Sequence, residues 1–300
     1  MGGSYYDSSA RTVRAASLGY HSKGVDEIFT QSKERRIHES MIPSKALLRE
    51  SRDSVNHPNS VPIIIALDTT GSMGDIPHYL VKEGLPKMVG NIIQKGVPDP
   101  QILFLGVGDH ECDRAPLQVG QFESGDEELD LWLTRTWLER GGGGNAGESY
   151  LLAWYFGAKH TVLDCVEKRG EKGILITIGD EPGLTSLPRR SVEEIMGKDV
   201  QGNYSDQQLL DLVSESYDVY HLHIHHGGSY KRAEDYWKHI LGQHCIIVDN
   251  YENVSEVISN LVVSNVKGRV TYNPTATNVI VDSKTDVTDS SSSKPGEMIL

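Results

Sequence analysis

The sequence predicts an α/β protein built on one open, mostly parallel β-sheet with helices on both faces. Short apolar runs, typical of buried parallel strands, alternate along the chain with longer segments of helical character. Repeated strand–helix units of this kind form parallel sheets through right-handed crossovers. Each apolar run also ends in a polar or acidic residue, so polar groups are expected to gather at one edge of the sheet.

The elements follow from these patterns in chain order. Strands are expected at Pro62–Leu67, Ile102–Val107, Gly173–Ile178, Asp218–Ile224 and Cys245–Val248, with a short edge strand near Leu117–Phe122. Helices are expected at Ile76–Lys95, Glu127–Glu139, Glu148–Lys168, Asp206–Ser216, Tyr230–Leu241 and Asn253–Val263. Gly84 and Pro86 should break or kink the first of these helices.

Polar segments flank this alternating region, which is expected to form a domain over residues 61–267. Residues 1–60 are predicted to be an extended N-terminal arm with at most short helices, near Gly24–Arg36 and Ser44–Arg52. Residues 268–300 are rich in Ser, Thr and Asp and are predicted to form a flexible C-terminal tail.

Composition narrows the classes of partner. With 38% hydrophobic residues among 300, the chain can bury one substantial core. Its formal net charge of −13 argues against binding to nucleic acid or anionic lipid. The chain shows no signal peptide and no apolar run of membrane-spanning length. Its three widely spaced cysteines favour reduced thiols in a cytoplasmic compartment over disulfides or a zinc site.

The most informative motif is Asp68-Thr69-Thr70-Gly71-Ser72, which follows the first strand of the domain. Asp68, Thr70 and Ser72 place a carboxylate and two hydroxyls at alternate positions of a tight turn, where they can converge. Hard oxygen donors without a strong nucleophile suit Mg²⁺, Mn²⁺ or Ca²⁺. The alternative is a turn rich in Ser and Thr, in which Asp75 caps the next helix.

Other strand ends supply further acidic groups. The residues past the later strands include Asp109, Glu111, Asp180, His225 and Asp249. Asp and Gly are common turn residues, which explains any single case. Clustered carboxylates nevertheless repel one another unless a cation or protons lie among them.

The Asp68–Ser72 motif resembles the D-x-S/T-x-S signature of von Willebrand factor A domains, the metal-ion-dependent adhesion site (MIDAS). The resemblance covers about residues 61–263 by the order of elements. It implies a doubly wound, Rossmann-like domain with a metal on its upper face, held by Asp68 and the two hydroxyls. The position that matches a later water-mediated Asp ligand is Asp180, after Ile174–Gly179.

The chain departs from that family in the loop before the central helix. The family has a Gly-Gly-Thr loop, whereas this chain has Gly141–Gly144 followed by Asn145. Asn145 and Glu148 are candidate replacement ligands, but their spacing also fits a capping box, which we favour as their main role. The loop is similar to a variant in bacterial, phage and alpha-kinase-associated domains of the same family.

Three functions compete. The first is a non-enzymatic module in which the metal docks a carboxylate of a partner protein; a metal-free, degenerate scaffold is a variant of it. The resemblance suggests as partner an AAA-type ATPase, an assembly subunit or a second copy of the chain. The second is a metal-dependent hydrolase that uses His221, His223, His225 and His226. The third, nucleotide chemistry, lacks both G-x-x-x-x-G-K-[ST] and G-x-G-x-x-G. The first is the prediction.

Overall fold

A six-stranded β-sheet forms the centre of the molecule in the computed structural model, which describes residues 5–140, 147–197, 202–225 and 230–268. The strand order is β10-β9-β6-β2-β3-β4, and every neighbouring pair is parallel except the edge strand β4. The strands are β2 (Val61–Asp68), β3 (Pro100–Val107), β4 (Leu117–Val119), β6 (Gly173–Gly179), β9 (Tyr217–Ile224) and β10 (Cys245–Val248). The predicted fold class is confirmed.

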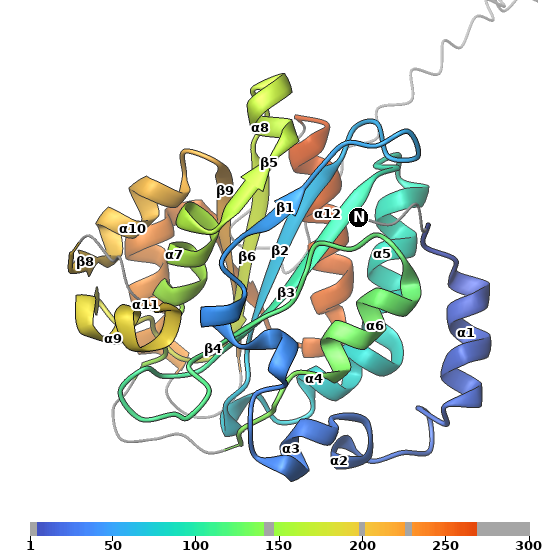
Figure 1. The fold of residues 1–300 in the computed structure, drawn as a ribbon, viewed down its shortest axis with the longest axis horizontal. Coiled ribbons are helices and arrows are strands. Elements are labelled where there is room, and N and C mark those ends of the chain that lie inside the picture. The colour runs from blue at the N-terminus through green and yellow to red at the C-terminus, as the bar shows by residue number, and fades with distance from the viewer. Residues whose placement is uncertain (1–4, 141–146, 198–201, 226–229, 269–300) are drawn as a thin grey trace, which may run out of the picture.

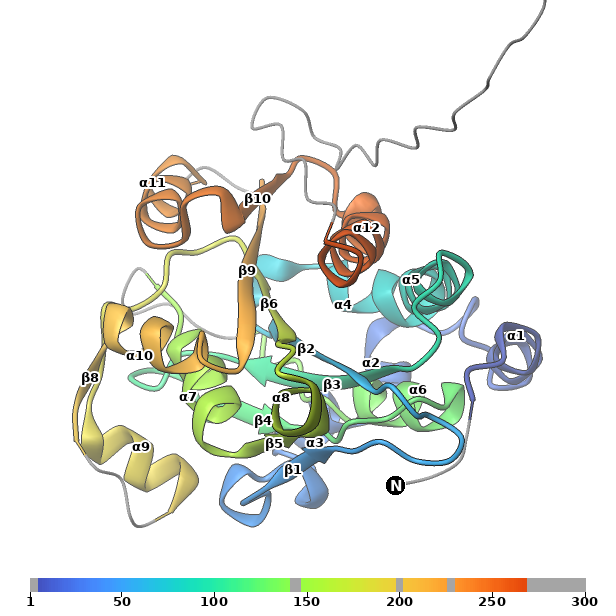
Figure 2. The same ribbon diagram turned by 90° about the horizontal axis from the view of Figure 1, so that it is seen from above.

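Helices cover both faces of this sheet (Figures 1 and 2). One face carries α1 (Ser8–Ser17), α4 (Ile76–Tyr79), α5 (Leu85–Gln94), α6 (Asp126–Thr134) and α12 (Val254–Val266). The other face carries α7 (Leu151–Lys159), α9 (Arg189–Met196), α10 (Asp206–Val213) and α11 (Tyr230–Leu241).

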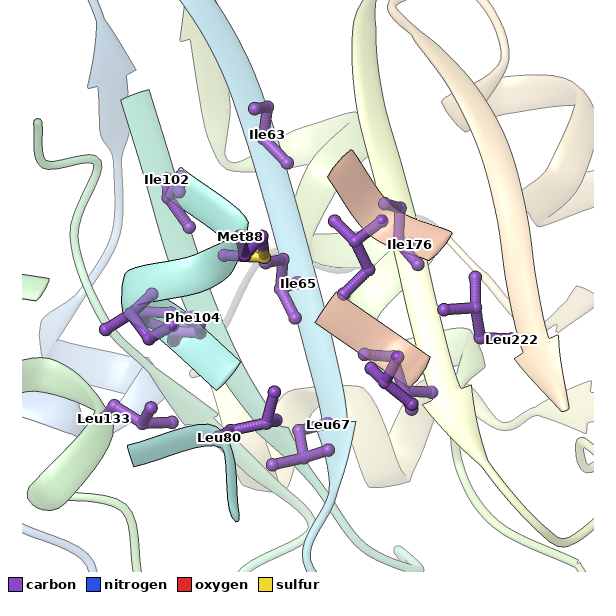
Figure 3. Packing of buried hydrophobic residues seen from close by; sticks show 14 of the residues in the cluster. Ile63, Ile65, Leu67, Leu80, Met88, Ile102, Phe104, Leu133, Ile176 and Leu222 are labelled. Atoms are coloured by element: carbon purple, nitrogen blue, oxygen red, sulfur yellow. The ribbon is translucent and has the colours of Figure 1, made fainter. Parts of the chain in front are cut away.

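Alternation along β2 divides the core between the two faces. Ile63, Ile65 and Leu67 point to the α5–α12 side, where they pack with Met88 and other apolar side chains (Figure 3). Ile64 and Ala66 belong to the core on the opposite face. Because β2 is buried on both faces, its sequence is a continuous apolar run and does not alternate between apolar and polar residues.

The order in which successive strands join the sheet reverses at β2. The next strand, β3, lies on one side of β2, and β6 lies on the other. The helices of the two crossovers, α5 and α7, accordingly cover opposite faces. Open α/β sheets bind ligands at such a switch point, outside the carboxyl ends of the strands. Asp68 ends β2 and Asp180 directly follows β6, so both lie at this point.

The helix expected at Ile76–Lys95 is distorted where Gly84 and Pro86 predicted a break. Residues Leu80–Gly84 form a π-helical turn between α4 and α5, in which the Leu85 N–H bonds to the Leu80 carbonyl. Pro86 has no N–H, so the carbonyl of Val81 loses both of its possible helical donors. The guanidinium of Arg11 donates hydrogen bonds to the carbonyls of Val81 and Lys82 instead.

Three other helix predictions need correction. The segment expected as one helix over Glu148–Lys168 contains α7, the short strand β5 (Thr161–Leu163) and α8 (Asp164–Arg169). The helix expected near Ser44–Arg52 is wrong, because β1 (Arg49–Ser51) pairs with β5 there. Helix α9 was not expected, and its neighbours β7 (Ser186–Leu187) and β8 (Tyr204–Ser205) form a small antiparallel pair.

The N-terminal residues are more structured than the predicted extended arm. They form α1, α2 (Val25–Ile28) and α3 (Thr30–Glu34), and Ala15, Ile28 and Phe29 join the core beside α5 and α6. Arg11 attaches α1 to the domain, because its side chain is buried and pairs with Asp130 of α6 at 3.1 Å. The predicted C-terminal tail, from residue 269 on, lies outside the described residues.

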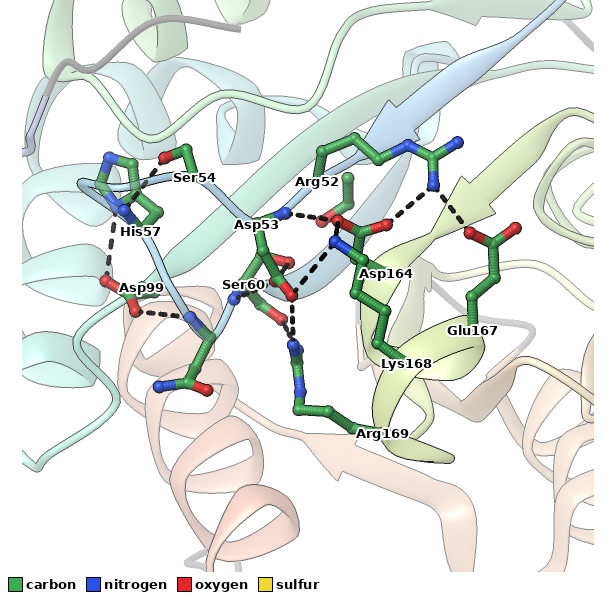
Figure 4. A network of polar contacts seen from close by, with 12 residues as sticks. Arg52, Asp53, Ser54, His57, Ser60, Asp99, Asp164, Glu167, Lys168 and Arg169 are labelled. Carbon is green, nitrogen blue, oxygen red and sulfur yellow. Dashed lines mark hydrogen bonds and ion pairs between the residues drawn. The ribbon is translucent and has the colours of Figure 1, made fainter.

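A polar network fastens the segment before β2 at the amino end of the sheet (Figure 4). Asp164 of α8 accepts hydrogen bonds from Arg52 and from the Asp53 N–H, both at 2.8 Å. Asp53 in turn accepts from Ser60 and Arg169, each at 2.7 Å. These contacts fix the entry into β2, at the end of the sheet opposite Asp68.

Two further expectations concern membranes and thiols. Among the residues that the structure describes, no helix has the length and apolarity needed to cross a membrane. All three cysteines are free thiols: Cys165 and Cys245 are buried, and Cys112 is exposed.

Candidate metal centre

Asp68, Thr70, Ser72 and Asp180 form one continuous chain of hydrogen bonds at the switch point. Asp68 Oδ1 accepts from the Thr70 hydroxyl at 2.7 Å and from the Thr70 N–H at 2.8 Å. The Thr70 and Ser72 hydroxyls lie 3.1 Å apart, and Ser72 donates to Asp180 Oδ1 at 2.8 Å. The structure therefore brings together the four residues that the motif and the family resemblance predicted.

Tyr150 completes the surroundings of Asp68 from the helix side. Its hydroxyl donates to Asp68 Oδ2 at 2.8 Å, and both side chains are fully buried. The ring reaches this position only because residue 179 is glycine. A Cβ on Gly179 would lie 1.7 Å from the Tyr150 hydroxyl and 3.1 Å from Asp68 Oδ2.

Glu148 lies in the same region, and the prediction that it caps the helix is wrong. Helix α7 begins at Leu151 with Tyr150 as its N-cap, so Glu148 precedes the helix. Its backbone instead bonds to the loop after Asp180: the Glu148 N–H donates to the Pro182 carbonyl at 2.9 Å. Its carboxylate oxygen Oε2 is buried and has no hydrogen-bond partner among the described residues. Asn145 lies outside the described residues.

No cationic side chain in the described part of the chain forms an ion pair with Asp68 or Glu148, and burial makes their negative charge costly. Burial, with the nearby Asp180 charge, raises the pKa of Asp68 to about 7 despite the hydrogen bonds from Thr70. Burial and the charges of Asp68, Asp113 and Asp109 raise the pKa of Glu148 to about 10. A divalent cation would reverse both shifts, because it stabilises the ionised carboxylates.

The donor set fits a hard cation. It consists of two hydroxyls and the carboxylates of Asp68 and Asp180. The unpartnered oxygen of Glu148 is a further candidate ligand. No three His, Cys, Asp or Glu side chains converge as a metal-ligand group in the described parts of the chain. Such a group is not required here, because hydroxyls and water complete the shell of a hard cation.

A second polar cluster follows β3, beside the first. Asp109 is buried, and its Oδ1 accepts from the Glu111 N–H at 2.9 Å, while its Oδ2 has no hydrogen-bond partner within the described residues. The Ser149 hydroxyl lies 2.7 Å from Nδ1 of His110 and 3.4 Å from Asp109. Burial lowers the pKa of His110. This cluster adds acidic charge next to Glu148.

The histidines of β9 pack in the core, and among the residues that the structure describes they form no metal-ligand group with other His, Cys, Asp or Glu side chains. His221 is fully buried, stacks on Trp237 with ring centroids 3.6 Å apart, and lies 2.8 Å from the Thr177 hydroxyl. His223 is buried, and its Nε2 lies 3.2 Å from the Tyr230 carbonyl. Burial lowers the pKa of both residues, that of His223 to about 4.

The run continues past the end of β9 with His225 and His226. His225 pairs with Asp249 at 2.7 Å, beyond the ends of β9 and β10. His226 lies outside the described residues.

Tyr150 and Ser149 were missed by sequence reasoning. Both precede α7 in a stretch that the helical pattern assigned to the helix itself. The available signal was Gly179, a glycine at the end of a strand whose other residues are bulky. A glycine there indicates close approach by another group, but it does not say which.

Comparison with known proteins gives a likeness to solved structures only. No protein-family model matches the chain, and no curated protein does. The pilus adhesin SpaC from Lactobacillus rhamnosus GG matches with 12% identity and a TM-score of 0.48, over 74% of this chain and 32% of the adhesin. Proximal thread matrix protein 1 from the mussel byssus matches with 12% identity and a TM-score of 0.44, over 69% of this chain and 48% of that protein.

A further structure of the mussel protein, described as having a zinc-occupied MIDAS motif, matches with the same identity and TM-score. The chain spans about a third of the adhesin's length and about half of the matrix protein's. Identities and scores at this level carry no function from either protein to this one.

Proposed function

We propose that this protein is a divalent-cation-dependent protein-interaction module of the von Willebrand factor A type. The cation, Mg²⁺ or alternatively Mn²⁺ or Ca²⁺, would be held by Asp68, Thr70, Ser72 and Asp180. The single observation that carries the proposal is the hydrogen-bonded chain of these four residues at the switch point of the sheet.

The chemistry of this donor set favours docking over catalysis. Hydroxyl ligands are neutral, so a cation held by them and by few carboxylates keeps positive character and an exchangeable position. A carboxylate from a partner protein can enter that position. The chain's own residues orient the site: Tyr150 holds Oδ2 of Asp68, and Thr70 holds Oδ1.

In this proposal, Glu148 supplies the ligand that a Thr of the loop provides in the family. The family's Thr is absent from the Gly141–Gly144 loop. The buried, unpartnered Oε2 of Glu148 supports a role for this carboxylate as a ligand, directly or through water. Asn145 remains a candidate from sequence alone.

Docking can be tested with Mn²⁺-loaded protein and acetate as a stand-in for the partner's carboxylate. Proton relaxation of water reports exchangeable water on the bound Mn²⁺. We expect acetate to displace that water, whereas methanol at the same concentration leaves it in place. Bound Mn²⁺ whose water does not respond to acetate would indicate a purely structural metal. A protein that binds no divalent cation would leave the metal-free scaffold as the explanation.

A further inference from the structure

A basic pocket lies near the turn that carries Asp68, Thr70 and Ser72. Its volume is about 670 Å³, and its walls come from the α2–α3 segment, the loop before β4 and the segment after α6. The lining residues are Asp26, Ser32, Lys33, Arg35, Arg114, Trp137, Leu138, Glu139 and Arg140. Four of these side chains are cationic and two are acidic, although the whole chain carries a net charge of −13.

The two acidic side chains are already engaged in holding the pocket together. Asp26 pairs with Arg140 at 3.0 Å. The Glu139 carboxylate accepts hydrogen bonds from the backbone N–H groups of Arg114 and Ala115, at 3.1–3.2 Å and 3.1 Å. Ser32 accepts from the Leu138 N–H at 3.1 Å, which joins α3 to the segment after α6. The walls are therefore fastened to one another by specific contacts.

The cations, by contrast, remain available. Lys33, Arg35 and Arg114 are exposed and pair with no acidic side chain in the described ranges. They come from two separate segments of the chain and extend long side chains into a shared space. Such an arrangement recognises several separated negative charges better than a single one, because each ammonium or guanidinium group can hold its own carboxylate.

The pocket adjoins the candidate metal centre. The Arg140 carbonyl packs so closely on Gly71 that a Cβ there would lie 3.0 Å from it. Gly71 stands between Thr70 and Ser72, whose hydroxyls belong to the centre. Figure 1 shows α2 and α3 at the same end of the molecule as the carboxyl ends of the sheet strands.

We propose that this pocket is a second docking point for the same partner, and that the partner is an acidic segment of a protein chain. One of its carboxylates would take the exchangeable coordination position of the cation. Neighbouring carboxylates would pair with Lys33, Arg35 and Arg114. This inference rests on the proposed function. It also gives the N-terminal α2–α3 segment a role, because that segment supplies two of the three available cations.

The test uses the full chain loaded with Mn²⁺ and a fluorescently labelled peptide of about six glutamates, with a glutamine peptide as control. Binding is measured by fluorescence anisotropy. Lys33→Glu, Arg35→Glu and Arg114→Glu are each expected to weaken binding by roughly five- to tenfold, since each reversal replaces an attraction with a repulsion. The matched control is Lys172→Glu, an exposed cation that precedes β6 at the opposite end of the sheet. It should leave binding unchanged.

Mn²⁺ affinity, measured on the same variants, separates the two proposals. The pocket variants should bind Mn²⁺ as the wild type does, and this result together with weakened peptide binding supports the second docking point. Wild-type protein that binds Mn²⁺ but not the glutamate peptide would overturn the pocket proposal and leave the metal centre intact. Equal losses in the pocket variants and in Lys172→Glu would overturn it as well. Inorganic pyrophosphate that binds the pocket and is not displaced by the peptide would assign the pocket to phosphate ligands instead.

Discussion

At the scale of single residues, the centre depends on the buried carboxylates of Asp68 and Glu148, which form no ion pair with any cationic side chain among the described residues. Asp68 is fully buried, and its carboxylate accepts hydrogen bonds from Thr70 and Tyr150, neither of which is charged. Removing such a carboxylate from water is costly unless it is protonated or a cation is bound. The raised pKa values of Asp68 and Glu148 express this cost.

The first prediction concerns the pH dependence of stability in the metal-free protein. The folded pKa values, about 7 for Asp68 and about 10 for Glu148, lie above the ordinary 3.8 and 4.5. The folded state therefore holds protons that the unfolded state has released, so the free energy of unfolding falls as pH rises between those limits. Each group lowers the free energy of unfolding by at most about 1.4 kcal/mol per pH unit.

Urea denaturation in EDTA at pH 5, 7 and 9 measures this effect. The wild type should lose stability with rising pH, and Glu148→Gln should show a shallower loss. Addition of Mg²⁺ at pH 9 should restore stability to the wild type. A metal-free protein whose stability rises over this range would show that these carboxylates are not repelling one another.

The second prediction concerns the glycine that admits Tyr150. Gly179→Ala places a methyl group 1.7 Å from the present position of the Tyr150 hydroxyl. The ring must move and the hydrogen bond to Asp68 must break, which we expect to cost about 2–4 kcal/mol of unfolding free energy. Gly90→Ala in α5 is the matched control, because nothing lies within 4 Å of its added Cβ. That change should stabilise the protein by about 0.5–1 kcal/mol.

At the scale of elements, the N-terminal helix is joined to the domain by a defect in another helix. The π turn at Leu80–Gly84 and the missing N–H of Pro86 leave the Val81 carbonyl without a helical donor. Arg11 of α1 satisfies this carbonyl and pairs with Asp130 of α6. One buried side chain thus links α1, α6 and the turn between α4 and α5.

The third prediction follows from that link. Arg11→Met leaves the buried Asp130 with Arg14 as its remaining cationic partner and removes the side-chain donor to the Val81 and Lys82 carbonyls, which should cost about 2–4 kcal/mol of unfolding free energy. Arg11→Met combined with Asp130→Leu should recover part of this loss, because the buried carboxylate that loses one of its two arginine partners is then gone. Urea denaturation measures both. Arg190→Ala, which removes an exposed helix pair, should cause no measurable change, and an equally small effect of Arg11→Met would contradict the buried link.

Sequence patterns predicted the strands well because each buried strand is a continuous apolar run between polar ends. Cys245–Val248 and α11 agree to the residue with the structure. The errors fall where local pattern and tertiary contact disagree. Helix α1 was missed because its buried residues include a charged one, Arg11, which apolar periodicity does not count. The break at β5 was missed because Thr161–Leu163 fits either a helix or a strand.

At the scale of the whole molecule, topology explains why part of the site could be predicted. Asp68 and Asp180 are far apart in sequence, but the strand order makes β2 and β6 neighbours. The strand-end rule placed both at one edge of the sheet, and the family resemblance selected Asp180 among the later acidic residues. Tyr150 approaches from a helix that no strand-end rule places. The role of Glu148 depended on where α7 begins, and that boundary differed from the sequence pattern by three residues, from Glu148 to Leu151.

The most direct test of the metal centre is calorimetric titration of the purified, metal-free chain with Mn²⁺. We expect about one Mn²⁺ per wild-type chain, no binding to Asp68→Ala, and at least about tenfold weaker binding to Thr70→Val. Thr69→Val is the matched control, because the Thr69 hydroxyl donates to the Val107 carbonyl and not to the centre. Its affinity should equal that of the wild type. Mn²⁺ binding to Asp68→Ala with wild-type affinity would show that the cation is held elsewhere.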